Sequence, residues 1–247
     1  MAIVLVDYHK GNIRSVQRGL QVVGAQVLVS DNPEDVRQAE AVVLPGVGAY
    51  RDASDTLQEL GLMEALREVC SEGVPFLGIC LGMHLMFEGG IEHASAENPA
   101  PGLGLLPGVV GRVSAQDAEG RHFKVPHVGW NSVHSAQGTP GSCAPAAAPA
   151  CAGEGECLAG EAQDLVRDFA FARALFEGIR PGEFFYFTHS FQAPEGEGTV
   201  ARTCHAQWFP SAVVVPGLPQ FGVQFHPEKS SDAGAALLRN FVRIANG

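Results

Sequence analysis

The chain has 247 residues, of which 46% are hydrophobic and 17% are charged, a balance typical of a globular protein rather than a disordered or fibrous one. Its formal net charge is −11 and it holds no basic run, which argues against nucleic acid as a partner because phosphate binding needs clustered Lys and Arg. No stretch approaches the roughly eighteen apolar residues of a membrane span, so we expect no membrane partner. A chain this long can bury roughly 70–75% of its unfolded surface in one core, which predicts a single domain over residues 1–247.

The N-terminal segment and the cysteines indicate a compartment. The segment from Met1 to Asp7 lacks the basic start and long apolar core of a signal peptide and is typical of a first strand. We therefore expect a reducing, cytoplasmic location, where cysteines are more often free or catalytic than bridged. The six cysteines are Cys70, Cys80, Cys143, Cys151, Cys157 and Cys204.

Short apolar runs and segments with helical spacing alternate through the first part of the chain. The predicted strands there are 3–6, 27–29, 41–44 and 74–79. The predicted helices are one capped by Asn12, one over 50–71 with a break near Gly61, and one over 81–88. Such alternation predicts a parallel sheet with helices on both faces.

The second part of the chain is richer in strands, predicted at 109–113, 131–134, 184–187, 199–203, 211–215 and 221–225. A final helix begins at about Ser231. We therefore predict an α/β fold with a mixed, mainly parallel central sheet flanked by helices. Between them, residues 136–160 are mostly Ala, Gly, Pro, Ser, Cys and Glu, which predicts a flexible surface loop.

A metal site is not expected. Cys151 and Cys157 lie in this loop, but the pair lacks zinc-site spacing and a second pair of ligands. No phosphate-binding or dinucleotide motif is present either, so we predict no cofactor.

The segment Gly78-Ile79-Cys80-Leu81-Gly82 carries the strongest chemical signal. A predicted strand runs into a cysteine with glycines two residues before and after it, which is the cysteine form of a nucleophile elbow. The helix that follows favours a thiolate at its N-terminus, and the Leu81 amide can face a developing oxyanion. A buried structural cysteine on a Gly-rich turn is the alternative.

The segment 222–228, Gly-Val-Gln-Phe-His-Pro-Glu, supplies a base and its orienting group. Residues two apart on an extended segment project to the same side, so Glu228 can hold one nitrogen of His226 while the other faces a thiol. By itself this motif also suits a solvated turn. A zinc deaminase would need a downstream Pro-Cys-x-x-Cys, which is missing.

A glycine-rich turn, Pro45-Gly46-Val47-Gly48, follows the third predicted strand. Glycines at the carboxyl end of a central strand let backbone amides approach a ligand closely. No Lys-Ser/Thr follows as in a P-loop, so an oxyanion-hole loop beside Cys80 fits better than a phosphate site.

These three segments, in this order in one chain, resemble the class I, triad-type glutamine amidotransferases. The resemblance is closest to the glutaminase subunits of imidazole glycerol phosphate synthases, and it spans nearly the whole chain apart from the loop around 136–160. The blocks that carry it are 6–8, 11–15, 44–49, 75–83, 125–131, 185–190 and 222–231.

The resemblance implies a nucleophile Cys80, a base His226 and an orienting Glu228. Glutamine would be converted to glutamate through a cysteinyl thioester. The ammonia would pass to a (β/α)₈-barrel cyclase partner that makes imidazole glycerol phosphate and an aminoimidazole carboxamide ribotide in histidine biosynthesis.

Other positions take roles from the same resemblance. The oxyanion site would be formed by Gly46, Val47, Gly48 and Leu81. Glutamine would be contacted by Gly82, His84, His189, Ser190 and Phe191. The partner would be contacted by Asn12, Trp130 and Lys229.

One position departs from the family pattern, which has glutamine four residues after the nucleophile. Here that residue is His84, one helical turn from Cys80 and on the same face. We expect weakened glutamine binding rather than its loss, because imidazole also donates a hydrogen bond. The alternatives are a glutaminase for another synthase, a stand-alone cysteine hydrolase, and a non-catalytic subunit with a decayed glutamine pocket.

Overall fold

The computed structural model describes residues 2–9, 11–136 and 169–247. Its main element is a nine-stranded sheet with the order β2-β1-β3-β4-β13-β12-β11-β8-β9. The first five of these strands run parallel to one another, and the remaining junctions are antiparallel. The predicted mixed α/β fold is confirmed.

The parallel part of the sheet is built from the apolar runs predicted in the sequence. Its strands are β1 (Ala2–Val6), β2 (Gln26–Ser30), β3 (Ala41–Gly46), β4 (Phe76–Cys80) and β13 (Gln220–Val223). In β1, Ile3 and Leu5 belong to one apolar cluster and Val4 and Val6 to another, so successive side chains enter cores on opposite faces of the sheet.

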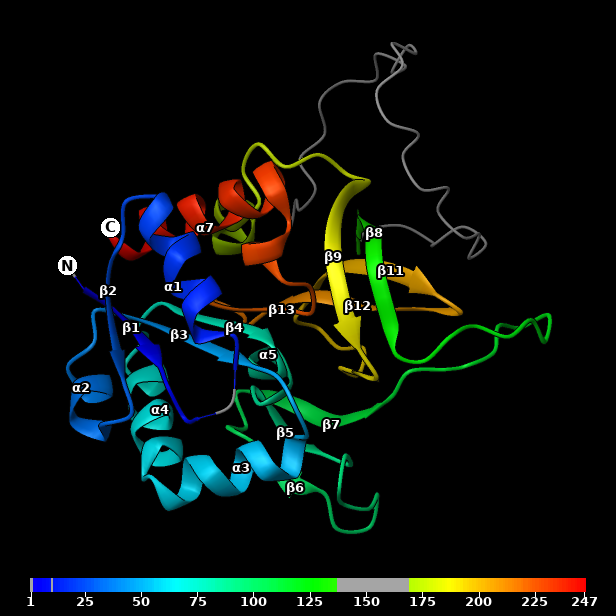
Figure 1. Ribbon diagram of the computed structural model, residues 1–247, viewed down its shortest axis with the longest axis horizontal. Coiled ribbons are helices and arrows are strands. Elements are labelled where there is room, and N and C mark those ends of the chain that lie inside the picture. Colours follow the sequence, from blue (N-terminus) through cyan, green and yellow to red (C-terminus); the bar gives the residue numbers. More distant parts are fainter. Residues whose placement is uncertain (1, 10, 137–168) are drawn as a thin grey trace.

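Helices cover both faces, as Figure 1 shows. One core packs against α1 (Ile13–Val22), α6 (Ala170–Leu175) and α7 (Ser231–Ala245). The other packs against α2 (Pro33–Arg37), α3 (Tyr50–Glu59) and α4 (Leu62–Ser71). The predicted break at Gly61 is confirmed, because this residue takes a left-handed φ of 70° between α3 and α4.

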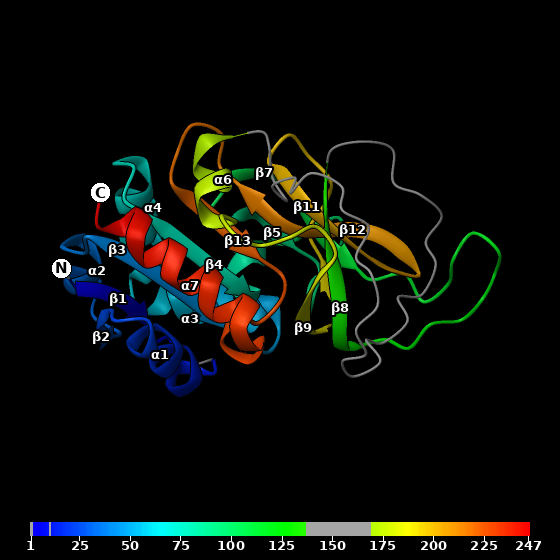
Figure 2. The same ribbon diagram turned by 90° about the horizontal axis from the view of Figure 1, so that it is seen from above.

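The antiparallel part consists of long strands from the second half of the chain, which Figure 2 shows extending away from both termini. They are β12 (Gln207–Val214), β11 (Thr199–His205), β8 (His127–Ser135) and β9 (Glu183–His189). Pairing of β8 with β9 sets His127 directly opposite His189.

One predicted helix is wrong. The segment 81–88 forms only a single turn, α5 (Leu81–His84), after which the chain enters strand β5 (Phe87–Gly90). The apolar run at 85–87 fits a helix and a buried strand equally well, and pairing with β7 decides for the strand.

A second, four-stranded sheet has the order β10-β7-β5-β6. Its other strands are β6 (Ala100–Pro101), β7 (Leu106–Arg112) and β10 (Phe191–Gln192). The loop predicted at 136–160 lies outside the described residues except for Ala136.

Candidate active site

Cys80 lies at the carboxyl end of β4, on a turn that its backbone conformation marks as strained. Its φ is 54° and its ψ is −106°, a region that residues other than glycine rarely occupy. The thiol is free and the residue is only 6% exposed. The turn places the side chain at the junction of β4 and α5, as the elbow motif predicts.

The two glycines around Cys80 are required by space. A Cβ at position 78 would lie 2.6 Å from the Gly82 carbonyl oxygen, and one at position 82 would lie 1.8 Å from that of Leu44. The turn can therefore pack against β3 only without side chains there. Gly82, predicted as a substrate contact, is buried and is not among the residues that line the cavity at Cys80.

His226 and Glu228 follow β13, the parallel neighbour of β4. The His226 Nδ1 lies 2.9 Å from Glu228 Oε1, and both side chains are buried. The second ring nitrogen, Nε2, is buried and has no hydrogen-bond partner among the described residues. The predicted contact between Glu228 and His226 is therefore present, and Nε2 remains unbonded within that part of the chain.

The pKa of His226 is set by burial and by two neighbouring side chains, Cys80 and Glu228. Burial disfavours the imidazolium, but interaction with the Cys80 side chain and then with Glu228 outweighs this and raises the pKa of His226 to about 9. At neutral pH the ring is therefore protonated. A cationic imidazole beside a cysteine is the pair that activates thiol nucleophiles.

Gln224, which the sequence reasoning missed, also reaches Cys80. Its Nε2 lies 3.8 Å from Cys80 Sγ, and its Oε1 lies 2.7 Å from His84 Nε2. Gln224 stands two residues before His226 on the same extended segment. The spacing rule that pairs His226 with Glu228 also predicts that Gln224 projects toward the thiol.

A cavity of about 450 Å³ opens in front of Cys80. Its walls come from the β3–α3 turn, the elbow, residues 92–93, and the end of β9. Eight of the predicted site residues line it, namely Val47, Gly48, Cys80, Leu81, His84, His189, Ser190 and Phe191. Gly46 lies at the end of β3 but does not line the cavity.

His189, at the cavity wall, belongs to a hydrogen-bonded chain that fixes every proton. Its Nδ1 lies 2.8 Å from the Phe191 carbonyl oxygen, which only accepts, so this nitrogen carries the hydrogen. Its Nε2 must then accept from His127 Nδ1, 3.0 Å away, and His127 Nε2 accepts from the Asn131 amide at 3.2 Å. Both nitrogens of His189 are thus already bonded within the protein.

The imidazoles of this wall are neutral. Burial, followed by the charge of nearby His205, lowers the pKa of His127 to about 3. Burial, followed by His127, lowers the pKa of His189 well below its ordinary value. Burial also lowers the pKa of His84 to about 4, although its bond to Gln224 acts in the opposite direction.

The three predicted partner contacts are placed as follows. Asn12 occupies the N-cap position of α1 but makes no side-chain cap; its Nδ2 lies 3.4 Å from Glu228 Oε1. Trp130 is 48% exposed and lies edge-on to Tyr186, with ring centroids 6.2 Å apart. The Lys229 ammonium lies 5.7 Å from the centroid of the same Tyr186 ring. Tyr186 therefore joins Trp130 and Lys229 on one surface.

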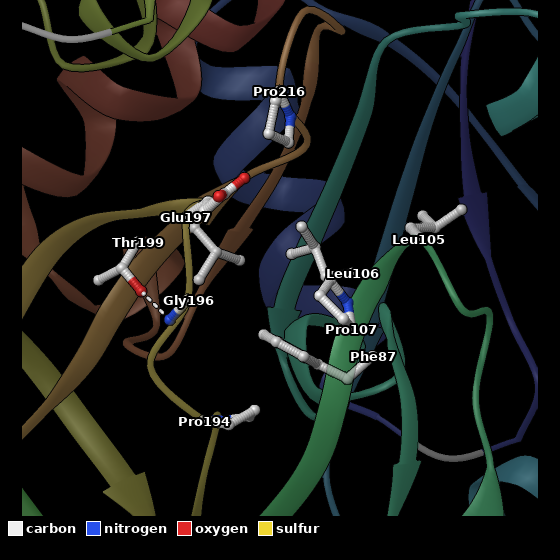
Figure 3. A pocket seen from close by; sticks show the side chains of 11 residues that line it. Phe87, Leu105, Leu106, Pro107, Pro194, Gly196, Glu197, Thr199 and Pro216 are labelled. Atoms are coloured by element: carbon white, nitrogen blue, oxygen red, sulfur yellow. Dashed lines mark hydrogen bonds between the residues drawn. The ribbon is translucent and has the colours of Figure 1, made fainter.

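A smaller cavity, of about 150 Å³, shares no lining residue with the one at Cys80 (Figure 3). Its walls are mainly apolar side chains, with Phe87 and Leu106 on one side and Pro194 and Pro216 among those on the other. Glu197 is its one ionisable lining residue. Among the described residues, no cysteine lines it.

Three general expectations can be compared with the structure. Within residues 2–9, 11–136 and 169–247, no group of three or more His, Cys, Asp or Glu side chains is arranged to hold a metal ion. In the same part of the chain no helix has the length and apolarity needed to cross a membrane. The expectation of free cysteines holds for Cys70 and Cys80, but it is wrong for Cys204, which is disulfide-bonded.

Comparison with known proteins identifies the class. The family model described as "Glutamine amidotransferase class-I" matches residues 4–245, which include Cys80, His226 and Glu228. The fold and the site define a class I glutamine amidotransferase, and the chain belongs to that family.

Curated relatives narrow the assignment to the HisH subunits of imidazole glycerol phosphate synthase. The HisH of Thermosynechococcus vestitus is 38% identical over 245 residues, which cover 98% of this chain and 97% of that protein. The HisH of Moorella thermoacetica is 39% identical over 242 residues, covering 98% of this chain and 94% of that protein. At this identity and coverage the chain belongs with the HisH subunits.

Solved structures agree on the fold. A crystal structure titled as a glutamine amidotransferase superposes with a TM-score of 0.63 at 19% identity, covering 99% of each chain. A chain of PurLQS from Thermotoga maritima gives a TM-score of 0.64 at 16% identity, covering 98% of each chain.

Proposed function

We propose that this chain is the glutaminase subunit of an imidazole glycerol phosphate synthase and that Cys80, His226 and Glu228 form its catalytic triad. The observation that carries the proposal is the strained Cys80 elbow facing an imidazolium that is held by a buried carboxylate. The reaction is hydrolysis of the glutamine side-chain amide to glutamate and ammonia.

The first half of the reaction uses the charged pair. The Cys80 thiolate attacks the carboxamide carbon, and the carbonyl oxygen becomes an oxyanion. As the C–N bond breaks, the His226 imidazolium gives its Nε2 proton to the leaving nitrogen, so that ammonia leaves and a glutamyl thioester remains. Glu228 holds the ring through Nδ1 during this transfer.

The second half regenerates the thiol. His226, now neutral, takes a proton from water as the oxygen attacks the thioester carbon. The C–S bond then breaks, glutamate leaves, and the proton returns to the Cys80–His226 pair. Glutamine plus water thus becomes glutamate plus ammonia.

Backbone amides supply the oxyanion site in this proposal. The Leu81 amide stands in the first turn of α5, where helix N–H groups have no intrahelical partner. The Val47 and Gly48 segment forms the opposite wall of the cavity, and Gly48 has a φ of 102°, a conformation that favours glycine. Together they flank Cys80.

The rest of the cavity suits an amino acid. Glu92 is the one carboxylate among its lining residues and can pair with the α-ammonium of glutamine. His84 and Ser190 line the same cavity and add polar contacts. Both ring nitrogens of His189 are already hydrogen-bonded within the protein. His189 therefore lines the cavity and holds the Phe191 carbonyl in place rather than binding glutamine through its ring nitrogens.

Exposed aromatic and apolar side chains on β8 support a partner surface there. Val128 and Trp130 are 56% and 48% exposed, and Tyr186 and Lys229 adjoin Trp130. Exposed aromatic clusters of this kind favour protein interfaces. We propose that a (β/α)₈-barrel cyclase docks here and receives the ammonia. A cytoplasmic location suits such a biosynthetic subunit.

The test is glutamate release from glutamine by the purified chain, alone and with a barrel cyclase subunit plus its nucleotide substrate. Low basal release with strong stimulation supports the proposal. Full release without the cyclase would overturn it in favour of an independent hydrolase. No glutamate release in either condition, with the cyclase shown to bind, would indicate a glutamine pocket that no longer functions.

A further inference from the structure

The thiol of Cys80 is bordered by more than its triad partner. Two neutral groups lie within hydrogen-bond range of Sγ: the Thr188 carbonyl oxygen at 3.9 Å and the Gln224 Nε2 at 3.8 Å. The carbonyl can only accept, so it favours the thiol form. The amide can donate, so it favours the thiolate.

Gln224 is built into the core and cannot easily turn away. It is fully buried, and its backbone N–H donates to the Ser211 carbonyl at 2.9 Å. Its side chain contacts two residues of the elbow, with Oε1 on His84 and Nε2 on Cys80. A buried amide with both ends occupied is a fixed dipole rather than a mobile side chain.

The direction of this dipole depends on His84. If His84 Nε2 carries a hydrogen, it donates to Gln224 Oε1 and the amide N–H points at Cys80. If the amide is turned round, its N–H donates to a bare His84 Nε2 and its oxygen faces the sulfur, where it would repel a thiolate. Only the first arrangement favours the charged nucleophile.

We propose that Gln224 is a further catalytic residue that stabilises the Cys80 thiolate with its side-chain N–H, and that His84 is the positioning residue that sets the direction of this amide. The proposal deepens the glutaminase function proposed above, and its catalytic meaning rests on that function. It also gives His84 a role toward the nucleophile in addition to its place in the cavity wall.

The other ionisable groups at Cys80 do not replace this donor. His226 supplies the positive charge and, beyond it, Glu228 supplies a negative one. Burial, and then the Cys80 charge, raises the pKa of Tyr8, so its phenol stays neutral. Among the imidazoles near His84, burial and then His127 keep His189 uncharged.

The test is the pH dependence of Cys80 alkylation by iodoacetamide in the free chain, followed by mass spectrometry of the peptide that contains Cys80. Gln224→Met keeps the length and burial of the side chain but removes the donor. We expect its alkylation midpoint to rise by roughly one pH unit, because hydrogen bonds to charged groups are among the stronger ones. An unchanged or lower midpoint would overturn the role of Gln224.

Two variants of His84 test its positioning role. His84→Gln retains a donor for Gln224 Oε1, so its midpoint should match that of the wild type. His84→Leu has no donor and should shift the midpoint upward, and it provides the same test of the network if Gln224→Met does not fold. An unshifted midpoint in His84→Leu would overturn the assignment of His84. No glutamine is present, so a chain without glutaminase activity would still give a clear result.

Discussion

One buried histidine of this protein is charged, whereas two others are neutral. His226 has a pKa raised to about 9, whereas those of His84 and His127 are lowered to about 4 and about 3. All three side chains are nearly inaccessible to water. Burial therefore does not explain the difference.

The difference comes from the neighbours. His226 interacts with two acidic groups, the Cys80 thiol and the Glu228 carboxyl, whereas His84 faces a neutral amide and His127 faces other imidazoles and an amide. Burial makes a histidine neutral unless an anion is buried with it. In the proposed mechanism the charged ring transfers the proton, and the neutral rings line the cavity or hold neighbouring groups.

The largest expected effect comes from removing the nucleophile that His226 faces. Cys80→Ala should lower partner-stimulated glutamate release by about 10⁶-fold, as loss of a triad nucleophile does elsewhere. Cys70→Ala is the matched control: it removes another free buried thiol, on α4, and should keep the rate within about twofold. Retained release in Cys80→Ala would contradict the triad.

A smaller effect is expected from the second negative group. Glu228→Gln keeps the size of the side chain but removes one of the charges that raise the pKa of His226. We expect a loss of about 10²-fold, at the low end of general acid-base contributions, and an alkaline limb of the pH–rate profile moved to lower pH. Glu177→Gln, at an exposed carboxylate that pairs with Arg243, is the control. A rate within twofold of wild type would argue against Glu228 as the orienting group.

His84→Gln tests whether a neutral wall residue also limits substrate binding. The single side-chain amide of a glutamine at this position can donate one N–H to Gln224 and leaves its second N–H and its carbonyl oxygen for the substrate. We expect KM for glutamine to fall by up to about tenfold with little change in kcat, which steady-state kinetics of the assembled synthase would show. A KM that stays the same or rises would mean that His84 does not weaken glutamine binding.

A further effect concerns stability rather than rate. The neutral histidines bind protons in the unfolded chain near pH 6.5 but bind them in the folded chain only near pH 4 or below. The stability that these neutral histidines contribute to the folded state is fully present above pH 6.5, and it is lost as the pH falls toward 4. We expect the free energy of unfolding in urea to fall by about 2 kcal/mol or more between pH 6.5 and 5. His84→Gln should reduce this fall in the free energy of unfolding. His93→Gln, at an exposed site, is the control and should leave the fall unchanged.

His226 acts in the opposite direction. Its folded pKa lies above its unfolded value, so its contribution is full below pH 6.5 and is lost as the pH rises through about 9. Urea unfolding of His226→Asn between pH 7 and 10 should therefore show a weaker alkaline loss of stability than wild type.

Much of the site could be predicted because its residues are close in sequence. The elbow needs small residues two positions either side of Cys80. The His226–Glu228 pair was predicted from a spacing of two on an extended segment, and the contact is present although Glu228 lies in a 3-10 turn, η1 (Pro227–Lys229). The helical spacing also placed His84 on the side of the nucleophile, although α5 is a single turn.

The remaining features depend on pairing between distant segments. The His127–His189 bond exists because β8 and β9 pair in a register that sets these two residues opposite each other. The Gln224–His84 bond joins the residue after β13 to the last residue of α5 and likewise has no local pattern. The strand at 87–90 was missed because its partner, β7, lies almost twenty residues later in the chain.

The most direct test of the contrast between charged His226 and the neutral buried histidines is an NMR titration of the imidazoles in the free chain. The His226→Asn and His84→Gln variants assign the two resonances. The account predicts that the His226 ring is protonated at pH 7 and titrates near 9, while the His84 ring is neutral at pH 7 and titrates near 4. A His226 ring that is neutral at pH 7, titrating at 6.5 or below, would contradict the thiolate–imidazolium pair on which the proposed mechanism depends.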